Sequence, residues 1–200
     1  QSESKPAVTT ARHVPYQRNA HFTGRDDELA DLRRSLVANE PGRRVQAICG
    51  LGGVGKTRHA MEVAHRASGA HAVLWVSLAG ESESADVATC LARALDLQLE
   101  GSAEADAWGP IRRALARRRS PILILDDADA VGPSAAHRLA HLAEQVADLR
   151  VIVTTRNAPL LRDEQRIFVD PLSLHPRDDA PSDAAMLLGE RVQVTGAHAT

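Results

Sequence analysis

The stretch VQAICGLGGVGKT, residues 45–57, joins a short apolar run to a glycine-rich loop that ends in lysine and threonine. Its second part, from Gly50 to Thr57, matches the pattern GxxxxGK[ST] in full. The apolar run before the glycines is typical of a buried strand, and the apolar spacing after them predicts a helix. A strand that opens through glycines into a helix is the setting in which this pattern binds phosphate groups.

The residue types in this loop suit the binding of phosphate groups. Glycines permit positive φ angles and bring successive main-chain N–H groups around an anion, at the positive end of the helix that follows. Lys56 is expected to reach the β and γ phosphates, and the Thr57 hydroxyl to bind Mg²⁺. The alternative is a glycine-rich turn that only caps the helix. The candidate nucleotide-binding residues of the loop are Gly50, Gly52, Gly53, Val54, Gly55, Lys56, Thr57 and Arg58.

Further apolar runs alternate with segments of helical spacing. Strands are predicted at 45–49, 72–78, 121–125, 149–154 and 166–170, and helices at about 26–37, 56–68, 84–96, 104–118 and 134–148. Near-continuous apolar strands that alternate with helices favour a parallel sheet covered on both faces. We therefore predict an α/β fold, a three-layer P-loop NTPase sandwich with a central parallel sheet of about five strands.

The chain divides into three predicted parts. Residues 1–20 are polar and contain proline without periodicity, so we expect a linker or flexible arm. Residues 21–172 are expected to form the nucleotide-binding P-loop domain, and residues 173–200 the beginning of a helical lid subdomain. The chain lacks an initiator methionine and a closing element, so we expect a segment of a longer protein.

Composition excludes several classes of protein. With 44% hydrophobic and 25% charged residues the chain can bury a core, which excludes general disorder and a collagen-like fibre. A net charge of −2 gives no reason to expect nucleic acid or an anionic membrane as partner. No apolar run approaches the roughly 18 residues of a membrane span, and the start lacks the features of a signal peptide. We therefore expect a cytoplasmic protein.

The apolar run at 122–125 ends in two acids, Asp126 and Asp127. A carboxylate at this position lies at the carboxyl edge of the sheet, where ligands of open α/β sheets bind. Asp126 is expected to hold Mg²⁺, and Asp127 to orient or deprotonate the attacking water. The alternative is a buried strand with a polar end. Because Asp127 is shorter than glutamate, we expect water to be positioned poorly and hydrolysis to be slow.

The apolar run at 151–153 ends in Thr154, Thr155 and Arg156. If its strand neighbours the phosphate-loop strand, Arg156 can contact the γ-phosphate and so distinguish ATP from ADP. The alternative is a solvent-exposed arginine after a strand. The candidate catalytic residues are Lys56, Asp126, Asp127 and Arg156, and the candidate metal ligands are Thr57 and Asp126.

The stretch FTGRDDEL, residues 22–29, resembles the hhGRExEL signature that opens the nucleotide-binding domain of signal-transduction ATPases with numerous domains (STAND), the NB-ARC-like family. The phosphate loop, the acid-ended strand and the Thr-Thr-Arg turn follow in that family's order and spacing. The resemblance implies that the backbone of Phe22 and Thr23, together with Arg25, contacts the adenine side. From the residues alone, this stretch indicates only a helix start with caps.

The resemblance also implies a regulatory switch in signal transduction or transcription. In that family ADP holds a closed monomer, and exchange for ATP opens it to self-associate and to activate an attached effector. Flanking effector and sensor domains are then expected partners.

Three other functions fit the residues less well. An ASCE-type motor or loader acting on nucleic acid or protein needs an arginine finger across an interface, for which residues 117–119 of the basic cluster at 112–119 are the candidates. A GTPase usually selects guanine through an Asn/Thr-Lys-x-Asp stretch, and no lysine follows Lys56. A pure interaction module is disfavoured because Lys56, Thr57 and Asp126 are all present.

Overall fold

The computed structural model describes residues 44–79, 87–98, 104–156, 164–175 and 181–196, together with Val14, Phe22, Arg25, Leu29, Ala30, Leu32 and Arg34. The predicted arm at 1–20, apart from Val14, lies outside the described residues, as does Thr23. Of the helix predicted at 26–37, four residues are described and all four are helical.

The described elements follow one another as strands alternating with helices. In chain order they are β1 (Val45–Cys49), α2 (Lys56–Ala67), β2 (Val73–Ser77), α3 (Val87–Ala94), α4 (Glu104–Ala116), β3 (Ile122–Asp126), the 3-10 turn η1 (Ala128–Ala130), α5 (Pro133–Gln145), β4 (Arg150–Thr155), β5 (Gln165–Phe168) and α6 (Asp183–Gly196). The strands form one five-stranded sheet in the order β2-β3-β4-β1-β5, and every described pairing is parallel. The predicted fold class is confirmed.

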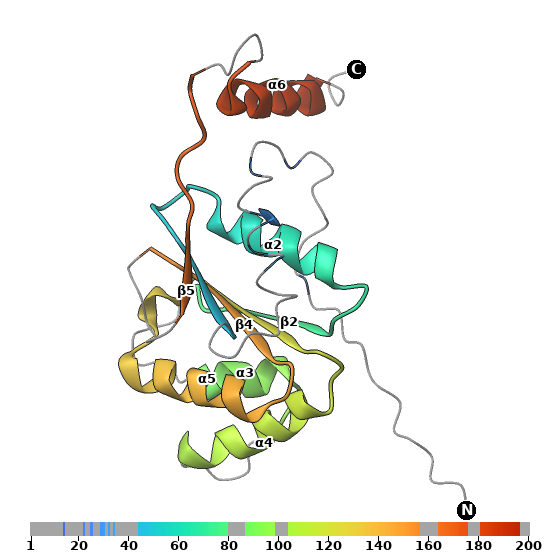
Figure 1. Cartoon of the computed structure of the whole chain (residues 1–200), viewed down its shortest axis with the longest axis vertical. Coiled ribbons are helices and arrows are strands. Elements are labelled where there is room, and N and C mark those ends of the chain that lie inside the picture. The colour runs from blue at the N-terminus through green and yellow to red at the C-terminus, as the bar shows by residue number, and fades with distance from the viewer. Residues whose placement is uncertain are drawn as a thin grey trace, which may run out of the picture.

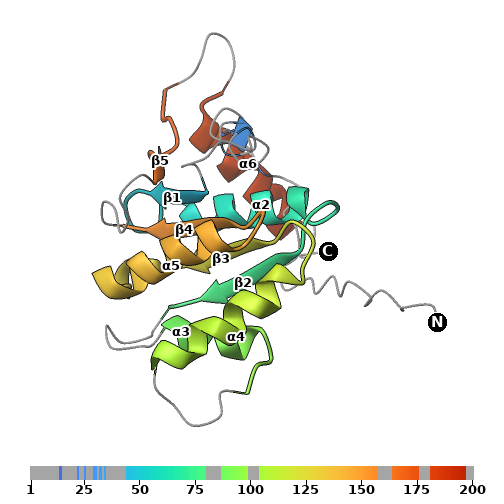
Figure 2. The ribbon, with the colours of Figure 1, turned by 60° about the horizontal axis from the view of Figure 1, so that its bottom comes forward.

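Helices cover both faces of the sheet and make three layers. α2 lies on one face, and α3, α4 and α5 lie on the other (Figures 1 and 2). In β1, Val45 and Ala47 face the core shared with α3, α4 and α5, whereas Ile48 faces the core under α2. β1, β3 and β4 are buried along their whole length, so their apolar residues do not alternate with solvent-facing ones, and polar residues such as Gln46 and Thr154 are buried with them.

The strand order brings three strand ends together. β4 lies between β1, which leads into the phosphate loop, and β3, which ends in Asp126. Cys49 is level with Thr155, and Leu125 is level with Val153, so the carboxyl ends of these strands meet at one edge. The condition set for Arg156, that its strand neighbours the phosphate-loop strand, is therefore met.

The C-terminal helix α6 lies apart from the sheet (Figure 1). Its start is joined to the preceding segment by a hydrogen bond from the Ala184 N–H to the Ser173 carbonyl, 3.2 Å long. The division into a P-loop domain at 21–172 and a helical lid from 173 stays a prediction. No described helix is long and apolar enough to cross a membrane.

Among the glycines that the structure describes, Gly50 is the one at which an added Cβ would come closest to another atom. Its φ is +154°, and a Cβ built on it would lie 2.5 Å from the Val169 carbonyl oxygen. Because that neighbour is backbone, Gly50→Ala must shift either the loop or the chain after β5. We expect the free energy of unfolding to fall by about 1–3 kcal/mol.

Thermal unfolding followed by circular dichroism measures this loss, which corresponds to a Tm lower by roughly 3–10 °C. Gly52→Ala is the matched control, because a Cβ there has nothing within 4 Å and its φ is not positive. Equal melting temperatures for the two variants would contradict the prediction.

Candidate functional site

The phosphate loop runs from the end of β1 to the first turn of α2. Gly53 and Gly55 have φ angles of 77° and 103°, in the left-handed region that favours glycine. Gly55 directly precedes α2, and the loop residues are exposed or half-buried. The loop backbone is therefore accessible at a helix N-terminus, where free N–H groups and the helix dipole favour an anion.

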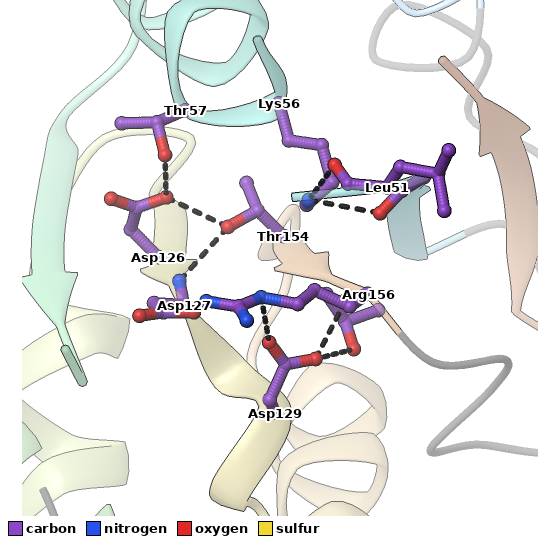
Figure 3. Close-up of polar contacts among 10 residues, drawn as sticks. Leu51, Lys56, Thr57, Asp126, Asp127, Asp129, Thr154 and Arg156 are labelled. Carbon is purple, nitrogen blue, oxygen red and sulfur yellow. Dashed lines mark hydrogen bonds and ion pairs between the residues drawn. The ribbon is translucent and has the colours of Figure 1, made fainter. Parts of the chain in front are cut away.

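The side chain of Lys56 folds back over this loop (Figure 3). Its Nζ donates hydrogen bonds to the carbonyl oxygens of Gly50 and Leu51, each 2.9 Å long. Neutral carbonyls are weaker partners for an ammonium group than the charged oxygens of a phosphate. The ammonium thus lies at the loop itself, on partners that a phosphate can replace.

A hydrogen-bond network joins α2, β3 and β4 below the loop (Figure 3). Asp126 Oδ1 accepts hydrogen bonds from Thr57 Oγ1 at 2.8 Å and from Thr154 Oγ1 at 2.7 Å. Thr154 Oγ1 also accepts the Asp127 N–H at 2.9 Å. Asp126 and Thr154 are buried, so the network is sheltered from water.

Thr57 and Asp126 fit the metal role predicted for them. A hydroxyl and a carboxylate are oxygen donors of the kind that Mg²⁺ prefers, and the ion usually takes its other ligands from water and substrate phosphates. Within the described ranges, no group of three or more His, Cys, Asp or Glu side chains is placed to hold a metal ion. The pair supplies two oxygen donors, and a bound Mg²⁺ would take its remaining ligands from water and from the phosphates of a nucleotide.

Asp127 and Arg156 lie at the same sheet edge but make different contacts. Asp127 starts η1 in a left-handed conformation, with φ 59° and ψ 52°. Arg156 is exposed, and its Nε lies 3.3 Å from Asp129 Oδ2. The structure thus places Arg156 after the strand next to β1, in an ion pair with Asp129 (Figure 3).

Two residues of the N-terminal signature lie against the start of α2. Arg25 is buried, and its Nη2 donates a hydrogen bond of 2.9 Å to the Val54 carbonyl in the phosphate loop. The Phe22 ring meets the His59 ring edge-on, with centroids 5.3 Å apart. Thr23, the other signature residue expected near the adenine, is outside the described part of the chain. Arg58, the last candidate of the phosphate loop, is exposed on the first turn of α2.

Sequence reasoning did not include Thr154, Asp129 or His59 in the site. A signal existed for Thr154, because a hydroxyl inside a strand buried on both faces needs a hydrogen-bond partner. Asp129 had no such signal, since its contact with the end of β4 depends on the pairing of β3 with β4. His59 lies on α2, with its Nδ1 3.3 Å from the Gly55 carbonyl oxygen, and its place in the helical pattern gave no signal of this contact.

The basic cluster lies at the other end of the sheet. Residues 117–119 directly precede the start of β3, and the Arg119 carbonyl accepts the Ala72 N–H just before β2. Burial lowers the pKa of the Arg118 guanidinium, with Asp96 opposing the shift. The cluster therefore does not join the phosphate loop of its own chain.

Comparison with known proteins gives matches across this region. The profile of the AAA domain family matches residues 40–160. A nucleotide-binding leucine-rich repeat (NLR)-like protein of Hyaloscypha variabilis is 41% identical over 78 residues, 36% of this chain and 8% of that protein. A protein of Mycobacterium tuberculosis described as an HTH-type transcriptional regulator is 32% identical over 124 residues, 62% of this chain and 13% of that protein.

A solved structure shares the fold. It is a STAND protein with a tetratricopeptide repeat sensor from Pyrococcus horikoshii, with a TM-score of 0.55 and 24% identity. The match covers 78% of this chain and 24% of that one. These findings confirm the P-loop fold and the resemblance to the STAND class, while this chain spans only a small part of each relative.

Thr154 offers a test of the buried network. Thr154→Val keeps the shape of the side chain but removes the hydroxyl, leaving the Asp126 carboxylate and the Asp127 N–H each without one partner. We expect the free energy of unfolding to fall by about 1–3 kcal/mol, measured by urea denaturation. Thr154→Ser keeps the hydroxyl and is the matched control, with the smaller loss expected for one buried methyl group. A valine variant as stable as the serine variant would show that the network contributes nothing.

Proposed function

The chain belongs to the AAA domain family of P-loop proteins, and on this basis we propose that it is an ATP- and ADP-binding switch domain with slow ATP hydrolysis. One observation carries the proposal. The Thr57 hydroxyl, directly after Lys56, lies 2.8 Å from the Asp126 carboxylate, although the two residues are 69 positions apart. This contact supports the proposal, because it joins the end of the phosphate loop to the acid proposed to hold Mg²⁺.

The proposed binding roles follow from position. The main-chain N–H groups of residues 50–57 bind the phosphates, and Lys56 leaves its carbonyl partners to contact the β and γ phosphates. Thr57 and Asp126 hold Mg²⁺, which, when bound, neutralises charge on the phosphate oxygens. The hydrogen bond that these two side chains share keeps both oxygens directed to one point.

For hydrolysis we assign Asp127 to the attacking water. Its main chain is fixed by the hydrogen bond to Thr154, so its carboxylate starts from a defined position next to Asp126. An aspartate reaches one methylene less far than a glutamate. We therefore propose that it orients water poorly and that turnover is slow.

Arg156 is proposed to contact the γ-phosphate. It follows β4, the strand next to the phosphate-loop strand, and so lies at the edge where the phosphates are expected. The γ-phosphate is present in ATP and absent from ADP, so a cation that binds it favours one nucleotide over the other.

The adenine side is proposed to meet the N-terminal signature. We assign the backbone of Phe22 and Thr23, together with Arg25, to this contact. The hydrogen bond from Arg25 to the Val54 carbonyl supports the assignment, because it ties the signature to the phosphate loop.

At the level of the whole protein, we propose regulation of an attached effector in signal transduction or transcription. Self-association in the ATP state and flanking effector and sensor domains belong to this proposal, as does a cytoplasmic setting. The NLR-like protein, the HTH-type regulator and the STAND protein support it, because the matched region is a small part of each.

The second candidate is an ASCE-type motor or loader that acts on nucleic acid or protein. The basic cluster at 112–119 includes residues just before β3, at the sheet end opposite the phosphate loop, and in this candidate function it would act on the site of a neighbouring subunit. The net charge of −2 favours the switch over a nucleic-acid motor.

Lys56→Ala tests the nucleotide site. One charge-assisted hydrogen bond is worth about 1.5–3 kcal/mol, so we expect ATP and ADP to bind roughly tenfold to a hundredfold more weakly. Calorimetry in the presence of Mg²⁺ measures both affinities. Lys5→Ala, at the chain's other lysine, is the matched control and should bind as the wild type does. Unchanged affinity in the Lys56 variant, or no binding to the folded wild type, would refute the proposed site.

The rate of hydrolysis separates the two candidate functions. For a switch we expect a turnover on the order of 10⁻² per second or lower, without stimulation by DNA or RNA. Asp127→Asn should lower this rate by about 10²-fold while nucleotide affinity stays within about twofold of the wild type. Phosphate release assays measure the turnover and its response to nucleic acid, and calorimetry measures the nucleotide affinity. Turnover of many per second, or strong stimulation by nucleic acid, would favour the motor instead.

A further inference from the structure

Asp129 binds the end of β4 through both of its carboxylate oxygens. Oδ1 accepts hydrogen bonds from Thr155 Oγ1 at 2.8 Å and from the Arg156 N–H at 2.6 Å. Oδ2 lies 3.3 Å from Arg156 Nε. The carboxylate therefore holds the main chain of Arg156 and the inner end of its guanidinium at the same time (Figure 3).

We propose that Asp129 is a positioning residue that holds Arg156 ready to bind the γ-phosphate and so sets the preference for ATP over ADP. The inference rests on the role proposed above for Arg156. The Arg156 side chain is 62% exposed, and a long exposed side chain occupies many rotamers unless something restrains it. A side chain that is already restrained loses less entropy when a ligand binds it.

The geometry favours a role in which Asp129 supports the Arg156 guanidinium and does not compete with a phosphate for it. A carboxylate at Nε takes the inner edge of the guanidinium, and the outer Nη edge stays available to a phosphate. Part of the Asp129 carboxylate is also engaged by Thr155 and by the main chain. Its place is therefore fixed independently of the arginine side chain, as a positioning group requires.

The same contact links two parts of the proposed site. Asp129 lies in η1, which begins directly after Asp127. Thr154, the neighbour of the Asp129 partner Thr155, forms hydrogen bonds with both Asp126 and the Asp127 N–H. The turn that directly follows the proposed metal and water residues is thus joined to the residue proposed to contact the γ-phosphate.

Asp129→Asn is the substitution that tests the inference. Asparagine keeps an oxygen that can accept from Thr155 and the Arg156 N–H, but it loses the charge that pairs with Nε. Because the Arg156 side chain of this ion pair is largely exposed, we expect AMP-PNP, a non-hydrolysable ATP analogue, to bind about two- to fivefold more weakly, with ADP affinity unchanged. Calorimetry with Mg²⁺ on the full chain measures both, and Asp129→Glu should recover part of the loss.

Two controls isolate the effect. Glu144→Gln removes an exposed carboxylate from α5 and should leave the affinity ratio unchanged. In an Arg156→Ala background, Asp129→Asn should have no further effect on the ratio, because a positioning residue acts only through the group that it positions. A general effect on folding would lower both affinities and would persist in that background, which would overturn the inference.

The remaining outcomes distinguish this inference from the proposed function. If the folded wild type binds neither nucleotide, the proposed function fails. If Arg156→Ala leaves the ratio of the two affinities unchanged, the role of Arg156 fails. If Arg156→Ala lowers the ratio but Asp129→Asn does not, or raises it, Asp129 does not position the arginine and the inference alone is wrong.

Discussion

The Asp126 carboxylate accepts hydrogen bonds from a helix on one side and a strand on the other, and the positions of both depend on it. Thr57 donates from the first turn of α2, and Thr154 donates from β4. Asp126 is 8% exposed, so its polar partners must come largely from the protein. Because Thr57 directly follows Lys56, the same bond sets where the phosphate loop lies relative to β3 and β4. The buried carboxylate thus links the start of α2, where the phosphate loop ends, to the end of β4.

The strands beneath this point are built to be rigid. Ile124 and Ile152, two neighbours from β3 and β4, are fully buried, and helices cover both faces of the sheet. A close-packed scaffold of this kind resists continuous deformation, so polar groups at its edge keep their spacing. The candidate site residues lie at the carboxyl ends of these strands and in the segments that follow them, where the main chain takes conformations such as the left-handed one of Asp127.

How much could be read from the sequence depended on whether the relevant partners are near one another in the chain. The phosphate loop was predictable because all its parts lie within residues 50–57, and Asp126 was predictable because an acid ended an apolar run. The strands could be predicted, but their order could not, since periodicity carries no information about which strands pair. The contact of Thr154 with Asp126 depends on that order. Asp129 lies on a single 3-10 turn, which has no periodic signature, and its contact with Arg156 became visible only with the fold.

A nucleotide switch needs a group that treats its two ligands differently, because a ligand with equal affinity for two states shifts nothing. In the proposed site, the loop backbone meets phosphates that ATP and ADP share, and so contributes chiefly to binding both. Lys56 is proposed to contact both the β and γ phosphates, so it contributes to the binding of ADP as well as of ATP. Arg156 lies outside the loop, directly after the neighbouring strand β4, where only the γ-phosphate is expected. If the proposed roles hold, the free energy available for switching is concentrated in an exposed arginine, and the neighbouring η1 turn, which connects β3 to α5, also serves to hold that arginine in position.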